Sequence, residues 1–177
     1  MRGYCDMSRL TKTLSNDLAL IRTPHYPVRH DYSQSHRHHA LLGIGGNMGD
    51  VVRRFEHLYI FLVKSPFITL IETSPILRNP PFGYLEQDNF YNATLHVQTM
   101  LSAIELLRYI LRIEKQFGRK RSFANAPRTL DIDMIFYDNE KIDKPRLKVP
   151  HPHWKQRDSV VIPLQQMKGI PWSKRHL

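Results

Sequence analysis

Two carboxylates that could hold a divalent cation, Asp131 and Asp133, stand two residues apart in the otherwise apolar stretch LDIDMIFY. If this stretch is a β-strand, both side chains point to the same face about 7 Å apart, and Ile132, Met134 and Phe136 point into the core. Two carboxylates this close raise one another's pKa, so a positive charge is expected beside them. Two interpretations are open: a surface pair bridged to nearby arginines, or a metal site.

The basic residues before this pair favour the metal site. Between Glu114 and Asp131 the chain carries no acid, and its basic residues there are Lys115, Arg119, Lys120, Arg121 and Arg128. Guanidinium groups bind phosphate oxygens bidentately, and Mg²⁺ prefers hard oxygen ligands. Phosphoryl transfer needs little more from a protein than such positioning and charge compensation. The combination predicts a transferase that uses ATP.

A glycine-rich turn, GIGGNMGD at 43–50, needs a separate interpretation. It lacks the Lys-Ser/Thr of a P-loop, and Met48 stands at the sixth position of a G-x-G-x-x-G alignment, so neither nucleotide fingerprint is met. We interpret it as a tight turn from a strand into a helix.

The whole chain narrows the class of protein. Its 177 residues suit one domain, and 26 Lys plus Arg against 16 Asp plus Glu give a net charge of +10, which predicts an anionic partner. Cys5 is the single cysteine, so neither an intrachain disulfide nor a Cys-based zinc site can form. The N-terminus lacks the apolar segment of a secretory signal, and the longest apolar run, LYIFLV, is too short to span a bilayer. We therefore expect a cytoplasmic protein that does not enter a membrane.

Residues 1–39 differ from the rest, and we expect them to be a partly flexible extension of a domain at 40–177. Part of the extension is predicted to form a short amphipathic helix. The apolar residues that recur near helical spacing are Leu10, Leu14, Leu18 and Ile21. The histidine cluster at 36–39 fits either a solvated linker or a metal site, and we favour the linker because no cysteine or carboxylate stands at ligand spacing.

From Ala40 onward the pattern predicts strand, helix, strand, strand, helix and strand. The expected ranges are 40–45, 51–65, 67–77 with a break at Pro75, 90–99, 102–116 and the strand with the aspartate pair. This order suits an α+β domain with a ferredoxin-like βαββαβ core, in which two helices cover one face of a largely antiparallel sheet. The first and third strands are expected to be parallel and joined by right-handed crossovers. One more strand or helix is expected within 146–164.

Local signals support the two helices. Asp50 is expected to cap the first helix, and Ser102 with Glu105 forms an S-x-x-E capping box for the second. The residues expected to form the buried face of the second helix are Ile104, Leu107, Ile110 and Leu111. In the strand at 90–99, Phe90, Asn92, Thr94 and His96 are expected on one face, and Tyr91, Ala93, Leu95 and Val97 on the other.

Five motifs together resemble one known family. They are GIGGNMGD, NPPFGYLEQDNFYNATLHVQT, RIEKQFGRKR, APRTLDIDMIFYDN and LKVPHPHWKQR, in the order and at about the spacing of 6-hydroxymethyl-7,8-dihydropterin pyrophosphokinase. The resemblance covers Leu41 to about Leu164. It implies transfer of the diphosphate of ATP to the hydroxymethyl group of the dihydropterin, with release of AMP, in folate biosynthesis. The partners would be these two small molecules, with no nucleic acid or membrane, and we expect a monomer.

The resemblance also implies roles for individual residues. Asp131 and Asp133 would bind two Mg²⁺ ions, and Arg119 and Arg128 would act catalytically on the phosphates. The residues implied to face ATP are Leu107, Glu114, Arg121, Met134, Arg146 and His151. The residues implied to face the pterin are Pro80, Phe82, Phe90 and Asn92. Structural alternatives stay open for three of them: Phe90 as a core residue, Asn92 at a strand edge and His151 as the cap of a turn.

The chain departs from the family pattern at Ser159. Many members have an aromatic residue there that closes a sandwich around the pterin, so we expect Phe123 or Trp154 to take its place. We also expect the N-terminal extension to cover a surface that a C-terminal tail covers in other members. An alternative of another class is a basic RNA-binding module with structural aspartates, although no strand carries the glycine-aromatic pattern of RNA-recognition folds.

Overall fold

The computed structural model describes residues 10–81, 85–120 and 126–170. Its elements in chain order are β1 Leu10–Thr13, β2 Ala19–Arg22, β3 His38–Gly46, α1 Val51–Val63, β4 Ile68–Thr73, β5 Ile76–Asn79, β6 Phe90–Thr99, α2 Ala103–Gln116, β7 Asp131–Tyr137, β8 Ile142–Lys144, β9 Leu147–Val149, the short 3-10 helix η1 Trp154–Gln156 and α3 Asp158–Gln165. The six elements predicted between residues 40 and 137 are therefore confirmed, with the break at Pro75 separating β4 from β5. Among the described helices, none is long and apolar enough to cross a membrane.

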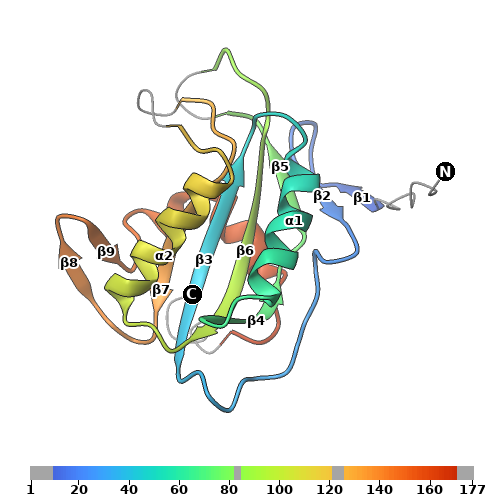
Figure 1. Cartoon of the computed structure of the whole chain (residues 1–177). Helices are drawn as coiled ribbons and strands as arrows, with labels where there is room; N and C mark the ends of the chain where they lie inside the picture. The colour runs from blue at the N-terminus through green and yellow to red at the C-terminus, as the bar shows by residue number, and fades with distance from the viewer. Residues whose placement is uncertain (1–9, 82–84, 121–125, 171–177) are drawn as a thin grey trace.

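The sheet has the predicted α+β architecture. Its strand order is β1-β2-β5-β6-β3-β7, with β4 also paired to β6, and every pairing is antiparallel. α1 and α2 lie side by side on one face of the sheet (Figure 1). The expectation that the first and third core strands are parallel is wrong, because β3 and β6 pair antiparallel. The α1 crossover makes β3 and β4 run the same way, and the chain then reverses before β6.

Both helices begin where their caps predict. The Asp50 carboxylate accepts the Arg53 backbone N–H at 3.0 Å, and the Ser102 backbone N–H donates to the Glu105 carboxylate at 2.8 Å, which completes the capping box. Gly118 follows α2 with a φ of +81°, a left-handed conformation that glycine adopts without strain.

The buried face of α2 agrees only in part with the predicted one: Ile110 is buried, Ile104 and Leu107 pack half-buried against the core cluster, and Leu111 is exposed. The residues that face the core are Ala103, Leu106, Ile110, Ile113 and Glu114. Leu107 is half-buried and Leu111 is 39% exposed, and both line the cleft described below. The apolar stripe of α2 is wider than its contact with the sheet, so periodicity alone did not separate its core side from its cleft side.

Two apolar layers enclose the sheet. A large cluster between the sheet and α1 and α2 includes Ala93, Leu95 and Val97 from β6, as the predicted alternation of this strand requires. A smaller cluster on the opposite face joins Leu41 to Trp154 and to residues of α3. Phe136 belongs to this second cluster, so its predicted place beside Ile132 and Met134 is wrong. The register between β3 and β7 shifts at Leu41/Leu42, and this irregularity reverses the alternation after Met134.

The predicted N-terminal helix is also wrong. Residues 10–22 form a β-hairpin, and β2 pairs with the edge of β5 (Figure 1). Leu10 and Leu14 are 71% and 41% exposed, whereas Ile21 joins the large core cluster. The four apolar residues therefore do not share one face. The domain boundary at residue 39 stays a prediction.

The segment that follows the hairpin packs against the sheet. Tyr26 is fully buried, and its hydroxyl donates to the Phe55 backbone oxygen at 3.0 Å. His36 is also buried and its ring bonds to the Thr69 hydroxyl at 2.8 Å, while His38 and His39 begin β3. The interpretation of 36–39 as a solvated linker is therefore wrong, because His36 is buried and His38 and His39 pair with β6.

Candidate active site

A cleft of about 1530 Å³ lies at the end of the sheet where β3 ends and β6 and β7 begin. Its walls come from these strands, from α2, and from the chain between Pro145 and Val160. The predicted site residues that line it are Pro80, Phe90, Asn92, Leu107, Glu114, Arg119, Arg128, Asp131, Asp133, Met134, Arg146 and His151. The other two, Phe82 and Arg121, lie outside the described residues. The fold thus brings together, in one concavity, residues that are far apart in the chain.

Asp131 is tightly paired at the start of β7. One carboxylate oxygen accepts from Arg128 at 2.8 Å, and the other forms an ion pair with Arg119. The Asp131 side chain is only 16% exposed. Charge-assisted pairs of this kind in a half-buried site are strong enough to order both arginines. These two arginines therefore compensate the charge of Asp131.

Asp133 faces the same cleft but is held more loosely. It lies opposite Gly43 and Asp131 lies opposite Gly45, so the two carboxylates point to one face of the sheet, as predicted. The nearest nitrogen atoms of basic side chains are His151 Nε2 and Arg157 Nη1, each 4.0 Å from Asp133 Oδ2. Burial, followed by the neighbouring Asp131 charge, raises the pKa of Asp133. This carboxylate is thus left short of positive charge.

Glu114 connects α2 to the charged end of the cleft. Its buried carboxylate accepts the Ile132 backbone N–H at 2.7 Å and forms an ion pair with Arg119. Burial raises the pKa of Glu114 to about 7, against the opposing effects of the Ile132 amide and Arg119. These contacts make Glu114 a support for Arg119 and for the first residues of β7.

The glycine-rich turn positions the segment that carries Arg128. The Asn47 backbone N–H donates to the Arg128 oxygen at 3.0 Å, and the Asn47 side-chain oxygen accepts the Arg128 N–H at 2.9 Å. A side chain at Gly46 would place its Cβ 2.5 Å from the Thr129 backbone oxygen, so only glycine permits this approach. No local pattern predicted a role for Asn47, because its partner is 81 residues away. The glycines here fit close packing of protein backbone, in agreement with the tight-turn interpretation.

At the other end of the cleft, an amide and an aromatic ring lie on β6. The Asn92 side-chain N–H donates to the Asn79 side-chain oxygen at 2.7 Å, and a Cβ at Gly45 would lie 2.6 Å from Asn92 Oδ1. The Phe90 ring is 7% exposed and lies under the Arg128 guanidinium, whose carbon is 5.1 Å from the ring centre. Arg128 therefore connects the aromatic end of the cleft to the carboxylate end.

The expected replacement for the missing aromatic residue is not provided by Trp154. Its ring is 6% exposed and packs edge-on against Phe136, with ring centres 4.9 Å apart, in the core cluster under α3. Ser159 itself lines the cleft. The other expected substitute, Phe123, lies outside the described residues.

The His151 ring bonds within a turn through one nitrogen and faces the cleft with the other. Its Nδ1 bonds to the Pro152 backbone oxygen at 2.8 Å, as the turn-cap interpretation requires, and its Nε2 faces Asp133. Arg157, which the sequence did not indicate, lies equally near that carboxylate. The exposed Arg146, between β8 and β9, adds a further cation to this wall.

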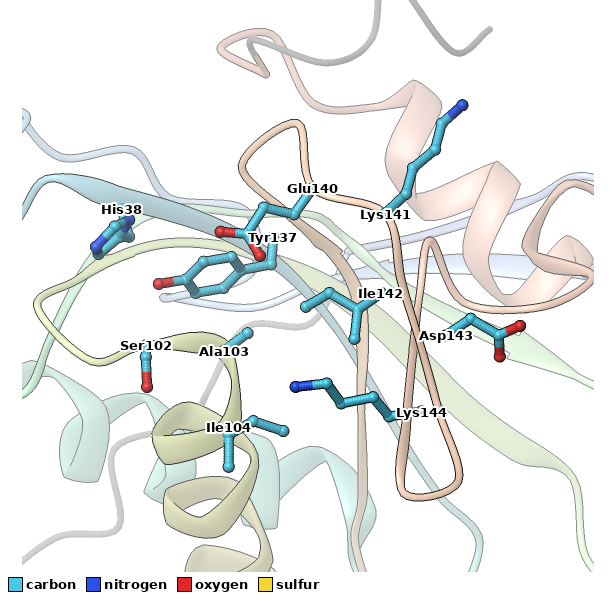
Figure 2. Close-up of a pocket in the computed structure, with 10 residues that line it drawn as sticks. All are labelled: His38, Ser102, Ala103, Ile104, Tyr137, Glu140, Lys141, Ile142, Asp143 and Lys144. Carbon is cyan, nitrogen blue, oxygen red and sulfur yellow. The ribbon is translucent and has the colours of Figure 1, made fainter.

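A second, smaller cavity of about 360 Å³ lies between the start of α2 and β8 (Figure 2). Three of its polar side chains, those of Tyr137, His38 and Ser102, bond to other protein groups. The Tyr137 hydroxyl donates to the Leu101 oxygen at 2.7 Å, His38 bonds to Asp138 at 2.7 Å, and the Ser102 cap is completed by Glu105. The large cleft gathers the aspartate pair of β7 and four arginines in one concavity. It is therefore the candidate active site.

Comparison with known proteins agrees with the cleft's chemistry. Residues 41–169 match the family model of 7,8-dihydro-6-hydroxymethylpterin-pyrophosphokinase. The 2-amino-4-hydroxy-6-hydroxymethyldihydropteridine pyrophosphokinase of Helicobacter pylori is 42% identical over 127 residues, which cover 71% of this chain and 78% of that protein. The Campylobacter jejuni protein of the same name is 38% identical over 140 residues, covering 78% of this chain and 88% of its own. The chain belongs to the 7,8-dihydro-6-hydroxymethylpterin-pyrophosphokinase family.

Proposed function

We propose that the cleft catalyses Mg²⁺-dependent transfer of the β,γ-diphosphate of ATP to the hydroxymethyl group of 6-hydroxymethyl-7,8-dihydropterin, with release of AMP. The chain is a pterin pyrophosphokinase of folate biosynthesis by its family. One observation carries the proposal in this detail: two aspartates and two arginines converge at the middle of one cleft. They are Asp131, Asp133, Arg119 and Arg128. On one side of them lie an amide and an aromatic ring, and on the other side lie apolar and basic residues.

The two carboxylates fit magnesium. They offer hard oxygen donors on one face of β7, and within the described ranges no three Asp, Glu, His or Cys side chains converge as a complete metal centre. Mg²⁺ commonly takes one or two carboxylates and completes its shell with water and substrate phosphates. We propose that Asp131 and Asp133 hold two Mg²⁺ ions together with ATP. When bound, the ions would neutralise phosphate charge and align the reacting oxygens.

The arginines supply charge to the phosphates in this proposal. Arg119 and Arg128 now pair with Asp131, and phosphate oxygens and metal would take over both sides of those pairs. The pterin hydroxyl oxygen then bonds to the β-phosphorus and loses its proton, and AMP leaves with the electrons of the α,β-bridge bond. Both guanidiniums would stabilise the charge that develops on the bridge. Glu114 keeps Arg119 in reach from the α2 side.

The two ends of the cleft suit the two substrates. Phe90 offers a ring face and Asn92 an amide for the pterin, with Pro80 beside them. Leu107 and Met134 form an apolar wall for adenine. Arg146 provides positive charge for ATP, His151 faces ATP from the same wall, and Arg121 is proposed to join them. Phe82 is proposed as a further pterin contact. We also propose that the protein works in the cytoplasm as a monomer and does not bind nucleic acid.

The test supplies ATP, Mg²⁺ and the dihydropterin and measures AMP. Asp131→Ala and Asp133→Ala should each lower AMP formation at least about 100-fold, the order seen when one preorganised charge is removed from a transition state. Asp143→Ala is the matched control, because this carboxylate is 84% exposed on β8 and pairs only with Lys148 among the described contacts. Chelation of Mg²⁺ should stop the reaction, and Mg²⁺ should restore it.

Other outcomes would overturn the proposal. ADP in place of AMP would indicate transfer of a single phosphoryl group. Formation of neither product by the wild-type protein would favour the basic RNA-binding alternative. Activity that survives in both aspartate variants would remove the proposed metal site.

A further inference from the structure

We infer that Leu18, in the N-terminal hairpin, is a substrate-contact residue that positions the pterin ring, an inference that rests on the function proposed above. Leu18 lines the large cleft although it lies outside the residues that match the family model, which begin at residue 41. The hairpin therefore adds a wall to the cleft that the family pattern does not describe.

The strand register places Leu18 at the pterin end. Ala19 pairs with Arg78 across β2 and β5, so the next position of the same register sets Leu18 beside Asn79. Asn79 in turn pairs with Phe90 across β5 and β6. Neighbours directly across antiparallel strands point to the same face. Leu18, Asn79 and Phe90 thus form one row across three strands, and all three line the cleft.

The hairpin holds Leu18 firmly. The Leu18 backbone oxygen accepts the Leu14 and Ser15 N–H groups at 2.8 and 3.2 Å, and the Leu18 N–H donates to the Ser15 hydroxyl at 3.2 Å. The next residues, Ala19 and Leu20, are 0% and 4% exposed, whereas the Leu18 side chain is only half-buried. A fixed backbone with a partly open apolar side chain is suited to contact a ligand.

An apolar side chain at this place could cover one face of the pterin ring. Ser159 lines the cleft without offering a ring, and Trp154 is enclosed in the core cluster under α3. The flat faces of a pterin ring are apolar, so an aliphatic contact recovers part of the burial that a second ring would supply. Leu18 is an apolar side chain already in the row that contains Phe90.

The experiment compares Leu18→Ala with Leu14→Ala. Leu14 is the matched control because it is a leucine of the same turn, is 41% exposed and is not among the cleft residues. Leu18→Ala should raise the KM for the dihydropterin and the dissociation constant for fluorescent 6-hydroxymethylpterin about fivefold, since it removes three partly buried carbons. The KM for ATP and kcat should change less than about twofold, and Leu14→Ala should behave as the wild type.

A second variant guards against a folding defect. Leu18→Gln keeps the length of the side chain and places a polar group against the ring, so it should weaken pterin binding while urea unfolding stays cooperative. Wild-type pterin affinity in Leu18→Ala and Leu18→Gln, or an equal rise in both KM values, would overturn the inference. If the wild type forms no AMP from ATP and the dihydropterin, the proposed function fails first. An active wild type with an unchanged Leu18→Ala refutes only the role of Leu18.

Discussion

The sheet face opposite α1 and α2 has two halves, and they differ in whether their polar groups bond to protein or face an open cleft. In the covered half, beneath α3 and the N-terminal segment, polar groups bond to protein: the His39 and His96 rings bond at 3.0 Å, and the Gln98 amide donates to the His36 oxygen at 2.8 Å. In the open half, the Asp133 side chain is 42% exposed and the Arg157 guanidinium is 4.0 Å away. The same strands therefore carry a completed core at one end and groups prepared for a ligand at the other.

The two halves should respond to pH in opposite directions. Burial, with His39 and Arg29 nearby, lowers the pKa of His96 to about 3, so acid opposes folding of the covered half. Burial and Asp131 raise the pKa of Asp133, so its ionisation at higher pH opposes folding of the open half. The cleft bears an electrostatic cost that ligands would relieve, as is common at functional sites.

The largest contrast should appear on truncation of apolar residues. Leu41 is fully buried in the covered half, so Leu41→Ala should lower the free energy of unfolding by about 2–5 kcal/mol. Leu111, 39% exposed at the cleft, is the matched leucine, and Leu111→Ala should cost less than about 1 kcal/mol. Urea unfolding measures both. Equal losses would show that the α2 wall of the cleft is packed as tightly as the covered half.

Acid titration should sharpen the contrast by a smaller amount for each pH unit. Below pH 6.5 unfolded His96 takes up a proton that the folded state resists down to about 3, so wild-type stability should fall by up to about 1.4 kcal/mol per pH unit in this window. His96→Gln should lose this part of the slope. His57→Gln, an exposed histidine on α1, should retain it. Identical slopes of the free energy of unfolding in wild type and His96→Gln would contradict the assignment.

The smallest expected effect is a gain in stability at the cleft. The pKa of Asp133 is raised on folding, so its charge is destabilising above that pKa, and Asp133→Asn should stabilise the ligand-free protein at pH 8. The gain should stay below about 1 kcal/mol because solvent screens this partly exposed side chain. Asp131→Asn should destabilise, since it breaks pairs with Arg119 and Arg128. Melting temperatures of the wild type and both variants, measured without ATP and Mg²⁺, test this prediction. A lower melting temperature for Asp133→Asn than for the wild type would refute it.

Much of the fold follows from local patterns in the sequence. The caps at Asp50 and Ser102 marked the helix starts, and alternation in 90–99 separated the two faces of β6. The pattern failed where tertiary contact competes with periodicity. Residues 10–22 have helical spacing but add strands to the β5 edge, and the irregular register of β7 moves Phe136 to the other face. Edge pairing and register shifts depend on distant partners that periodicity does not contain.

The sequence by itself determined the chemistry available to this protein: paired aspartates on one strand face, arginines before them, and the ordered motifs of a pterin pyrophosphokinase. Only the tertiary structure decided which groups meet. It joined Asn47 to Arg128 across 81 residues, brought Leu18 into the cleft and enclosed Trp154 in the core. Alternation and capping act over a few residues, so a sequence displays them directly. Contacts between distant segments arise from the packing of the whole chain, which no local pattern specifies.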